Sequence, residues 1–215
     1  MRLTDRRLEL VSAVVLSSAA LASSWASYQG SLWDGEQAAA YSRANVLRIQ
    51  ATDARREGDA RQADQRAMFI EWLNAIADRD ETRAGFYRER FPEEFRPAFN
   101  AWLRDRPRAN PSATPTPFLA REYDPPGHAA AAALDAKAEA TFAEGERANT
   151  ISDAFGQSAT ILASALFFGG ILQVFDSRSV KAGLLLVAAL AALFGVLRMA
   201  GLPVQVLGLA PLGYR

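Results

Sequence analysis

The chain has 215 residues, with 24 basic and 24 acidic side chains, one histidine and no cysteine. The balanced charge leaves no dominant basic patch, which argues against nucleic acid as a partner. Without cysteine, disulfides, thiolate catalysis and thiolate metal sites are excluded.

The first apolar segment, residues 8–26, follows a tail with three arginines. It approaches the roughly 20 residues that a helix needs to cross a bilayer. We therefore predict a cytoplasmic tail and a first transmembrane helix over residues 1–27. A cleavable signal peptide is the alternative, with Ala20-Leu21-Ala22 as the cleavage motif. Glu9 interrupts the start of the apolar run, which favours the uncleaved span.

A polar block, residues 28–152, separates the first span from the second. Its first part, residues 28–57, has small apolar residues in the 4-3-4-3 spacing of closely packed helices. These positions are Ala40, Ala44, Leu47, Ala51 and Ala54. We expect this helix to end near Glu57-Gly58-Asp59.

The last part of the block, residues 128–152, is predicted to return as a second helix that begins near His128. Its expected contact positions are Ala133, Ala136, Ala140, Ala143 and Arg147. At 1.5 Å per residue the two helices extend about 45 Å and about 38 Å. Their similar lengths predict an antiparallel helical stalk.

Residues 59–105 are predicted to form a small helical head. Asp59 is the expected N-cap of its first helix, and the chain should break and restart around residues 91–94. Aromatic side chains recur at helical spacing here and are interpreted as a core, with a ligand pocket as the alternative. Residues 106–127 contain six prolines and are expected to be a connector that lies against the bundle.

Two further spans follow, at residues 153–175 and 182–200, joined by a cytoplasmic loop at residues 176–181. Residues 201–215 then form an outer tail. Ala165-x-x-x-Gly169 and Ala191-x-x-x-Gly195 supply small-residue faces for helix contacts. The sequence thus predicts an all-α membrane protein with three transmembrane helices, and with the stalk and small head between spans 1 and 2.

Basic residues in the tail and in the short loop indicate the orientation. By the positive-inside rule both lie in the cytoplasm, so residues 28–152 are extracytoplasmic. Trp25, Tyr28 and Trp33 fall where the outer interface of the first span is expected. Only two of the 24 basic residues are lysine, and this with the abundant alanine suggests a GC-rich bacterial genome. We expect a multi-pass protein of the bacterial inner membrane with a cytoplasmic N-terminus.

The second span carries Gln157, Thr160 and Ser164 on one face. They favour interhelical hydrogen bonding over a permeation path, because no ionisable residue lies at mid-membrane. Arg198 ends the third span and is expected to pair with Asp153 or to reach the interface by itself.

Catalytic chemistry is not indicated. His128, the only histidine, excludes multi-histidine metal sites and is interpreted as a residue near a helix start. The acidic residues Asp78, Asp80 and Glu81 alternate with arginines and are interpreted as a self-paired surface rather than a cation site. No phosphate-binding loop or nucleophile motif occurs. We expect neither an enzyme nor a bound metal or cofactor.

Several segments resemble a group of uncharacterised bacterial inner-membrane proteins with three spans and a helical ectodomain between the first two. They are Pro92-Glu-Glu-Phe-Arg-Pro-Ala-Phe-Asn-Ala-Trp-Leu103, Asn110-Pro-Ser-Ala-Thr-Pro-Thr-Pro-Phe118, Glu122-Tyr123 and Ala148-Asn-Thr-Ile-Ser-Asp-Ala-Phe155. The resemblance implies no activity. Its polar positions, which we expect to serve interaction or structure, are Arg96, Asn110, Asn149 and Asp153.

The resulting functional hypothesis is a non-enzymatic membrane protein whose helical ectodomain binds a partner or senses a ligand. The expected partners are the lipid bilayer and either another membrane protein or further copies of the chain. An oligomeric channel or transporter subunit is the alternative, and an envelope scaffold is a further one.

Overall fold

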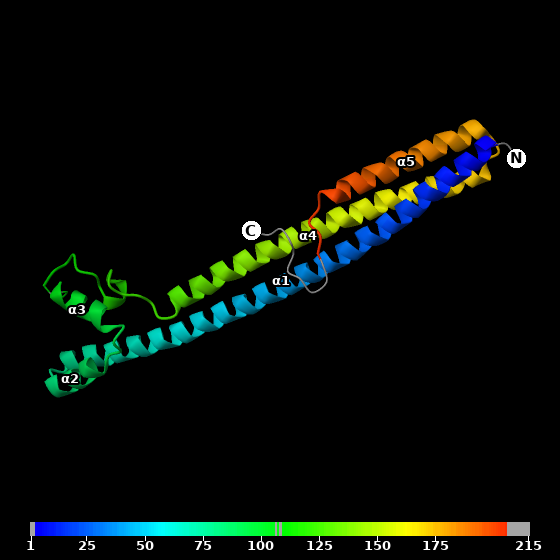
Figure 1. Cartoon of the computed structure of the whole chain (residues 1–215). Helices are drawn as coiled ribbons and strands as arrows, with labels where there is room; N and C mark the ends of the chain where they lie inside the picture. The colour runs from blue at the N-terminus through cyan, green and yellow to red at the C-terminus, as the bar shows by residue number, and fades with distance from the viewer. Residues whose placement is uncertain (1–2, 106, 108, 206–215) are drawn as a thin grey trace. The chain divides into compact units, whose positions relative to one another are not determined.

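The computed structural model describes residues 3–105, 107 and 109–205 (Figure 1). Every regular element in these residues is a helix, as predicted. The α-helices are α1 (Leu3–Ala77), α2 (Glu81–Arg90), α3 (Arg96–Arg104), α4 (His128–Ile171) and α5 (Arg178–Ala200), with 3-10 turns η1 (Pro117–Leu119) and η2 (Leu172–Val174). Three of them, α1, α4 with its 3-10 extension, and α5, contain stretches long and apolar enough to cross a membrane.

Backbone contacts divide the chain into two compact units. Unit 1 combines residues 1–43 with residues 140–215, and unit 2 is residues 44–139. Unit 1 therefore holds the apolar stretches of all three long helices, whereas unit 2 holds α2, α3 and the proline-rich segment.

Helix α1 does not end near residue 57, as the sequence analysis expected, but continues to Ala77. Gly58 lies inside the helix. A glycine is needed there because another segment of unit 2 passes very close to it. A Cβ atom at Gly58 would lie 1.9 Å from the carbonyl oxygen of Pro126. The glycine marks a close approach of two backbones rather than a helix end, and Asp59 is not an N-cap.

The break between α1 and α2 falls instead at residues 78–80. Arg79 has a φ of 60°, and the amide of Asp80 donates to the carbonyl of Ala75 (2.9 Å), which is the pattern of a Schellman helix end. Asp80 is the N-cap of α2, and its side chain accepts from the amide of Arg83 (2.9 Å). The sequence did not signal this stop, because an arginine stands where glycine is usual.

Small residues bring the three long helices of unit 1 together, as the glycine and alanine motifs predicted. A Cβ atom at Gly169 of α4 would lie 2.1 Å from Leu16 of α1, and one at Gly195 of α5 would lie 2.8 Å from Leu162. Ala19, Leu162 and Ala165 are buried between them. In Figure 1, α5 (orange) runs beside the parts of α1 (blue) and α4 (yellow) that belong to this unit.

The contact face of α1 follows the predicted spacing, but that of α4 does not. Ala40, Ala44 and Ala51 are fully buried on α1. On α4, however, four of the five expected positions are exposed (133, 136, 140 and 147), and the fifth, Ala143, is only half-buried. The buried positions repeat every seven residues instead, at Ala131, Ala138 and Gly145 and at Ala148, Phe155, Leu162 and Gly169.

The error in α4 arises from its composition. Residues 129–134 are mostly alanine on every face, so hydrophobic periodicity cannot choose between faces. In unit 1 the choice is made by size, since a Cβ atom at Gly145 would lie 2.6 Å from the ring of Tyr41. Only a glycine face fits there.

Unit 2 is held by a cluster of large aromatic side chains, the core that the sequence predicted. We call this buried set the aromatic cluster: Phe69, Trp72, Ala75, Ala84, Phe91, Phe95, Phe99 and Trp102. Phe118 and Tyr123, from the proline-rich segment, pack against it. The connector therefore lies against the helices, as expected. Helix α4 begins at His128, also as expected, directly after Gly127, whose φ of +76° requires glycine.

Candidate functional site

An apolar groove lies beside the aromatic cluster, between the last turns of α1 and helix α3. Its volume is about 310 Å³. The lining residues are Trp72, Leu73, Ile76, Trp102, Leu103, Pro107 and Ala109. The groove is open to a ligand or partner, because Leu73 keeps 37% of its surface exposed.

Both tryptophans of the groove are fixed from behind. The indole Nε1 of Trp102 donates to the carbonyl of Thr114 (2.8 Å), and its ring meets Phe69 at 5.3 Å between centroids. Trp72 packs edge-on against Phe99 at 4.9 Å. The indole N–H of Trp102 is used inside the unit and both rings line the groove, so the groove offers apolar carbon that suits an apolar side chain of a partner.

A chain of polar side chains joins α1 to the connector beside the aromatic cluster. The hydroxyl of Tyr123 accepts from Gln62 (3.1 Å) and donates to Gln65 (2.9 Å). The amide of Gln65 then donates to Glu94 (3.2 Å). Burial raises the pKa of Tyr123 above its ordinary value. Because Gln65 is almost fully buried and both ends of its amide are bonded, this chain fixes the connector to α1.

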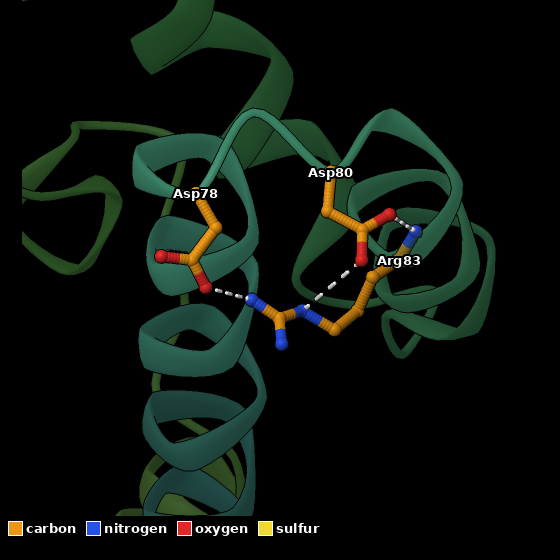
Figure 2. A network of polar contacts seen from close by, with 3 residues as sticks. All are labelled: Asp78, Asp80 and Arg83. Carbon is orange, nitrogen blue, oxygen red and sulfur yellow. Dashed lines mark hydrogen bonds and ion pairs between the residues drawn. The ribbon is translucent and has the colours of Figure 1, made fainter.

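The acidic residues at 78–81 form a joint between α1 and α2 rather than a cation site. Figure 2 shows the guanidinium of Arg83 between two carboxylates. One nitrogen donates to Asp78, and Nε lies 3.9 Å from Asp80, which is an ion-pair distance. The hydrogen bond to Asp78 raises the pKa of Arg83. The prediction of a self-paired surface is therefore supported for Asp78 and Asp80, which lie in the turn between α1 and α2, whereas Glu81 is the first residue of α2.

The polar positions taken from the resemblance are divided between the units. In unit 2, Arg96 donates to the carbonyls of Phe91 (2.8 Å) and Glu89 (2.9 Å), so it caps the end of α2. The side chain of Asn110 accepts from the amide of Ser112 (3.0 Å) and shapes a turn. Both residues have a structural use.

In unit 1 the structure brings Asn149 and Asp153 together, since the amide of Asn149 donates to the carboxylate (3.3 Å). Arg198 of α5 donates to Gln157 of α4. The hydrogen bond that Arg198 makes to α4 is therefore with Gln157 and not with Asp153. Gln157, the first residue of the predicted intramembrane polar face, therefore has Arg198 of α5 as its partner.

The other two residues of that face bond to their own helix. Thr160 donates to the carbonyl of Gly156 (3.0 Å), and Ser164 donates to that of Thr160 (3.1 Å). Such back-bonding satisfies each hydroxyl without a neighbouring helix. The expected interhelical hydrogen bonds are therefore not made by these two side chains.

The sequence analysis missed a polar clamp that holds the chain after α5, which we call the tail clamp. Gln29 of α1 is fully buried, and its amide donates to the carbonyl of Gln205 (2.9 Å) and accepts from its N–H (2.8 Å). Trp33 donates to the carbonyl of Pro203 (3.0 Å). In Figure 1 the segment after α5 (red) reaches α1. The only indication of the tail clamp in the sequence was this glutamine, which stands near the end of the first predicted span.

No group of three or more metal-binding side chains occurs among the residues that the structure describes. Comparisons of the chain with protein-family models, with curated proteins and with solved structures found no match. The class that the fold defines is thus an all-helical protein with three membrane-length apolar helices. The resemblance to three-span inner-membrane proteins stays a prediction.

Proposed function

We propose that this chain is a non-enzymatic protein of the bacterial inner membrane whose unit 2 binds a protein partner outside the cytoplasm. The observation that carries the proposal is the apolar groove beside Trp72 and Trp102, which is open and backed by a rigid aromatic cluster. An open apolar groove backed by a rigid core is typical of a surface that receives an apolar anchor.

The membrane placement is supported by where polar groups end the apolar surface of unit 1. Trp25 and Tyr28 form an exposed pair near one end, and Arg198 lies on Gln157 near the same end of α5 and α4. From Lys181 to Arg198, α5 rises about 25 Å at 1.5 Å per residue. This is close to the hydrocarbon thickness of a bilayer.

The antiparallel stalk is part of the same proposal. In unit 1, Leu16 of α1 meets Gly169 of α4, and Gly30 meets Phe155. In unit 2, Arg48 pairs with Glu139, and Arg55 pairs with Asp135. In each unit, therefore, higher numbers on α1 meet lower numbers on α4. Exposed ion pairs such as these stabilise little, so the alanine and glycine contacts supply most of the pairing.

Orientation is tested by labelling, which the absence of cysteine makes direct. Single variants Ala67→Cys in unit 2 and Ser179→Cys at the start of α5 both place a thiol at an exposed position. A membrane-impermeant maleimide should label Ala67→Cys in cells with a permeable outer membrane, and Ser179→Cys only after the inner membrane is opened. The reverse pattern would contradict the proposed orientation.

Partner binding is tested by photocrosslinking in cells. A benzophenone amino acid at Leu73, inside the groove, should give a discrete crosslinked protein. The same group at Val46, which is exposed and apolar but outside the groove, should not. Leu73→Glu should then abolish co-purification of the identified protein from mild detergent, whereas Val46→Glu should not. Equal crosslinking at both positions would refute the groove as the binding surface.

The two other hypotheses stay predictions. A channel or transporter subunit needs polar groups available to a permeant, but Thr160 and Ser164 use their hydroxyls on their own helix and Gln157 accepts from Arg198. An envelope scaffold differs from the leading proposal only in having no regulated ligand. Flux measurements in liposomes address the first, and the co-purification above addresses the second.

A further inference from the structure

A second concave site lies in unit 2, between α2 and α3, and it shares no lining residue with the groove. Its volume is about 530 Å³, which is within the usual range for a small-molecule site. Two helical faces form it, each made of residues three and four positions apart. The lining residues are Gly85, Arg88 and Glu89 of α2, Arg96, Phe99 and Asn100 of α3, and Phe91 between the helices. We call this site the α2–α3 pocket.

The guanidinium of Arg96 is held in place by the protein, but its hydrogen-bonding capacity is not exhausted. Nε donates to the carbonyl of Phe91 (2.8 Å), and Nη2 donates to the carbonyl of Glu89 (2.9 Å). A guanidinium carries five N–H groups, so three remain, and these have no hydrogen-bond partner among the described residues. Two of the three, one on Nη1 and one on Nη2, form the end-on pair that matches both oxygens of a carboxylate. Arg96 is therefore an oriented donor for an anion.

Arg88 brings a second positive charge to the pocket. Its side chain is exposed, and no hydrogen bond or ion pair joins it to another residue that the structure describes. The one acidic lining residue is Glu89. Because every side chain from residue 81 to residue 105 is described, the lining carries two positive charges and one negative charge. A ligand with a single negative charge balances this lining, whereas a dianion is repelled by Glu89.

Gly85 is an independent indication that the pocket is space for a ligand. It lies inside α2, where glycine is less favourable than alanine. No neighbouring atom of the described residues lies within 4 Å of a Cβ atom built there, so helix packing does not require a glycine. A larger side chain would extend from the wall of the pocket that Gly85 lines. The glycine thus keeps open a space that the protein itself does not fill.

We propose that the α2–α3 pocket binds a small organic monocarboxylate with an aromatic or other apolar portion. Arg96 and Arg88 donate charge-assisted hydrogen bonds to the carboxylate, and the carboxamide of Asn100 adds a neutral donor. The apolar portion lies against Phe91 and Phe99, which belong to the aromatic cluster. The pocket is separate from the groove, so this proposal and the partner-binding function can fail independently.

The test titrates the full-length protein in mild detergent with para-fluorobenzoate, followed by fluorine NMR, with protein-free micelles as the blank. We expect saturable binding with a dissociation constant in the millimolar range, as suits a ligand of this size. Absence of saturable binding would overturn the proposal.

Three competitors then test which part of the ligand is recognised. Benzamide lacks the charge, acetate lacks the ring, and phenylphosphonate carries up to two negative charges. Each should compete about tenfold more weakly than benzoate, because each loses a charge-assisted hydrogen bond or ring burial, or is repelled by Glu89. Competition by any of the three that equals or exceeds that of benzoate would overturn the proposal.

Variants of the lining test the location of the site. Gly85→Leu places a side chain in the pocket and should abolish binding. Arg88→Gln should weaken binding about tenfold, the effect of losing one charge-assisted hydrogen bond. Glu89→Gln should act in the opposite direction, strengthening benzoate binding and reducing the disadvantage of phenylphosphonate. The matched control is Arg104→Gln, which removes an exposed arginine of α3 outside the pocket and should leave the affinity unchanged.

The outcome stays clear because the variants differ in their structural demands. Arg96 is left unchanged, since it also caps α2. If Gly85→Leu is misfolded by circular dichroism, Arg88→Gln decides, because that exposed side chain has no bond within the described residues to lose. Wild-type affinity in a folded Gly85→Leu or Arg88→Gln variant would refute the pocket as the site. An equal loss in Arg104→Gln would mean that benzoate responds only to surface charge, which would refute it as well.

Discussion

Helices pack closely in both units, but small residues make the contacts in one unit and large aromatic residues make them in the other. In unit 1 the contacts use glycine and alanine, as where Gly169 receives Leu16 and Gly195 receives Leu162. In unit 2 the core is a set of interlocking phenylalanine and tryptophan rings. The difference agrees with the membrane placement proposed above, because helices in lipid gain little by burying apolar area, whereas a unit in water gains most from large side chains.

This comparison indicates which property each unit depends on. Unit 1 depends on close approach, so adding atoms at the glycines that receive another helix, Gly145, Gly169 and Gly195, should be harmful. Unit 2 depends on buried volume, so removing ring atoms should be harmful. Gly58 and Gly127 show that unit 2 also uses close approach at one place, where the chain enters α4 beside α1.

The largest effect is expected from removing a ring of the aromatic cluster. Phe95 is fully buried, and Phe95→Ala should cost about 3–5 kcal/mol of unfolding free energy through lost burial and a cavity. Its ring partners are Phe69, Phe91, Phe99, Phe118 and Tyr123. Thermal unfolding followed by near-ultraviolet circular dichroism measures the loss.

The control for that variant is Phe86→Ala. Phe86 is 48% exposed, so its removal should cost well under half as much. Equal losses from the two variants would mean that the cluster does not stabilise unit 2 as the structure indicates.

A pair of glycine variants on α1 should change stability in opposite directions. Gly58→Ala should cost about 1–3 kcal/mol, because its Cβ would meet the backbone at Pro126, which cannot rotate away. Gly35→Ala should add up to about 1 kcal/mol, since nothing lies within 4 Å and alanine favours the helix. The melting temperatures of the two variants and the wild type, measured in the same detergent, show the direction of each stability change. A stabilising Gly58→Ala would contradict the close approach.

The tail clamp should respond next. Gln29→Leu leaves the N–H and carbonyl of Gln205 without their partners, at a cost of about 2 kcal/mol. Hydrogen exchange of residues 201–205, measured by mass spectrometry, should become faster. Gln50→Leu, at an exposed position of α1, is the control and should leave that exchange unchanged.

The smallest effect concerns pH. Because burial raises the pKa of Tyr123 in the folded state, its contribution to stability is complete below the unfolded value of 10.0 and decreases as pH rises above it. The melting temperature of unit 2 should therefore fall more between about pH 9 and 11 in the wild type than in Tyr123→Phe, these limits lying about one unit on either side of the ordinary tyrosine pKa. Parallel curves would show that Tyr123 does not ionise from a buried site.

Some parts of the candidate sites could be predicted from the sequence, and others could not. The aromatic stripes predicted the cluster, but the groove exists only because α3 and Pro107 fold back beside the end of α1. Arg96, Asn110 and Asn149 were identified as polar positions of interest, yet their use in capping, turning and pairing depends on carbonyls and amides that no side-chain pattern reveals. Arg198 was expected to pair with Asp153 or to reach the interface by itself, but it bonds Gln157, one helical turn further along α4.

The amino-acid sequence by itself determined what depends on local composition: helices, three apolar stretches, the start of α4 at His128 and the break near Pro92. Tertiary structure alone decided what depends on distances between backbones. It carried α1 through Gly58 to Ala77, selected the Gly145 face of α4, and placed Gln29 on Gln205. The physical reason is that glycine and alanine do not distinguish one face of a helix from another in the sequence. Which face makes the contact is decided only when a second helix packs against it.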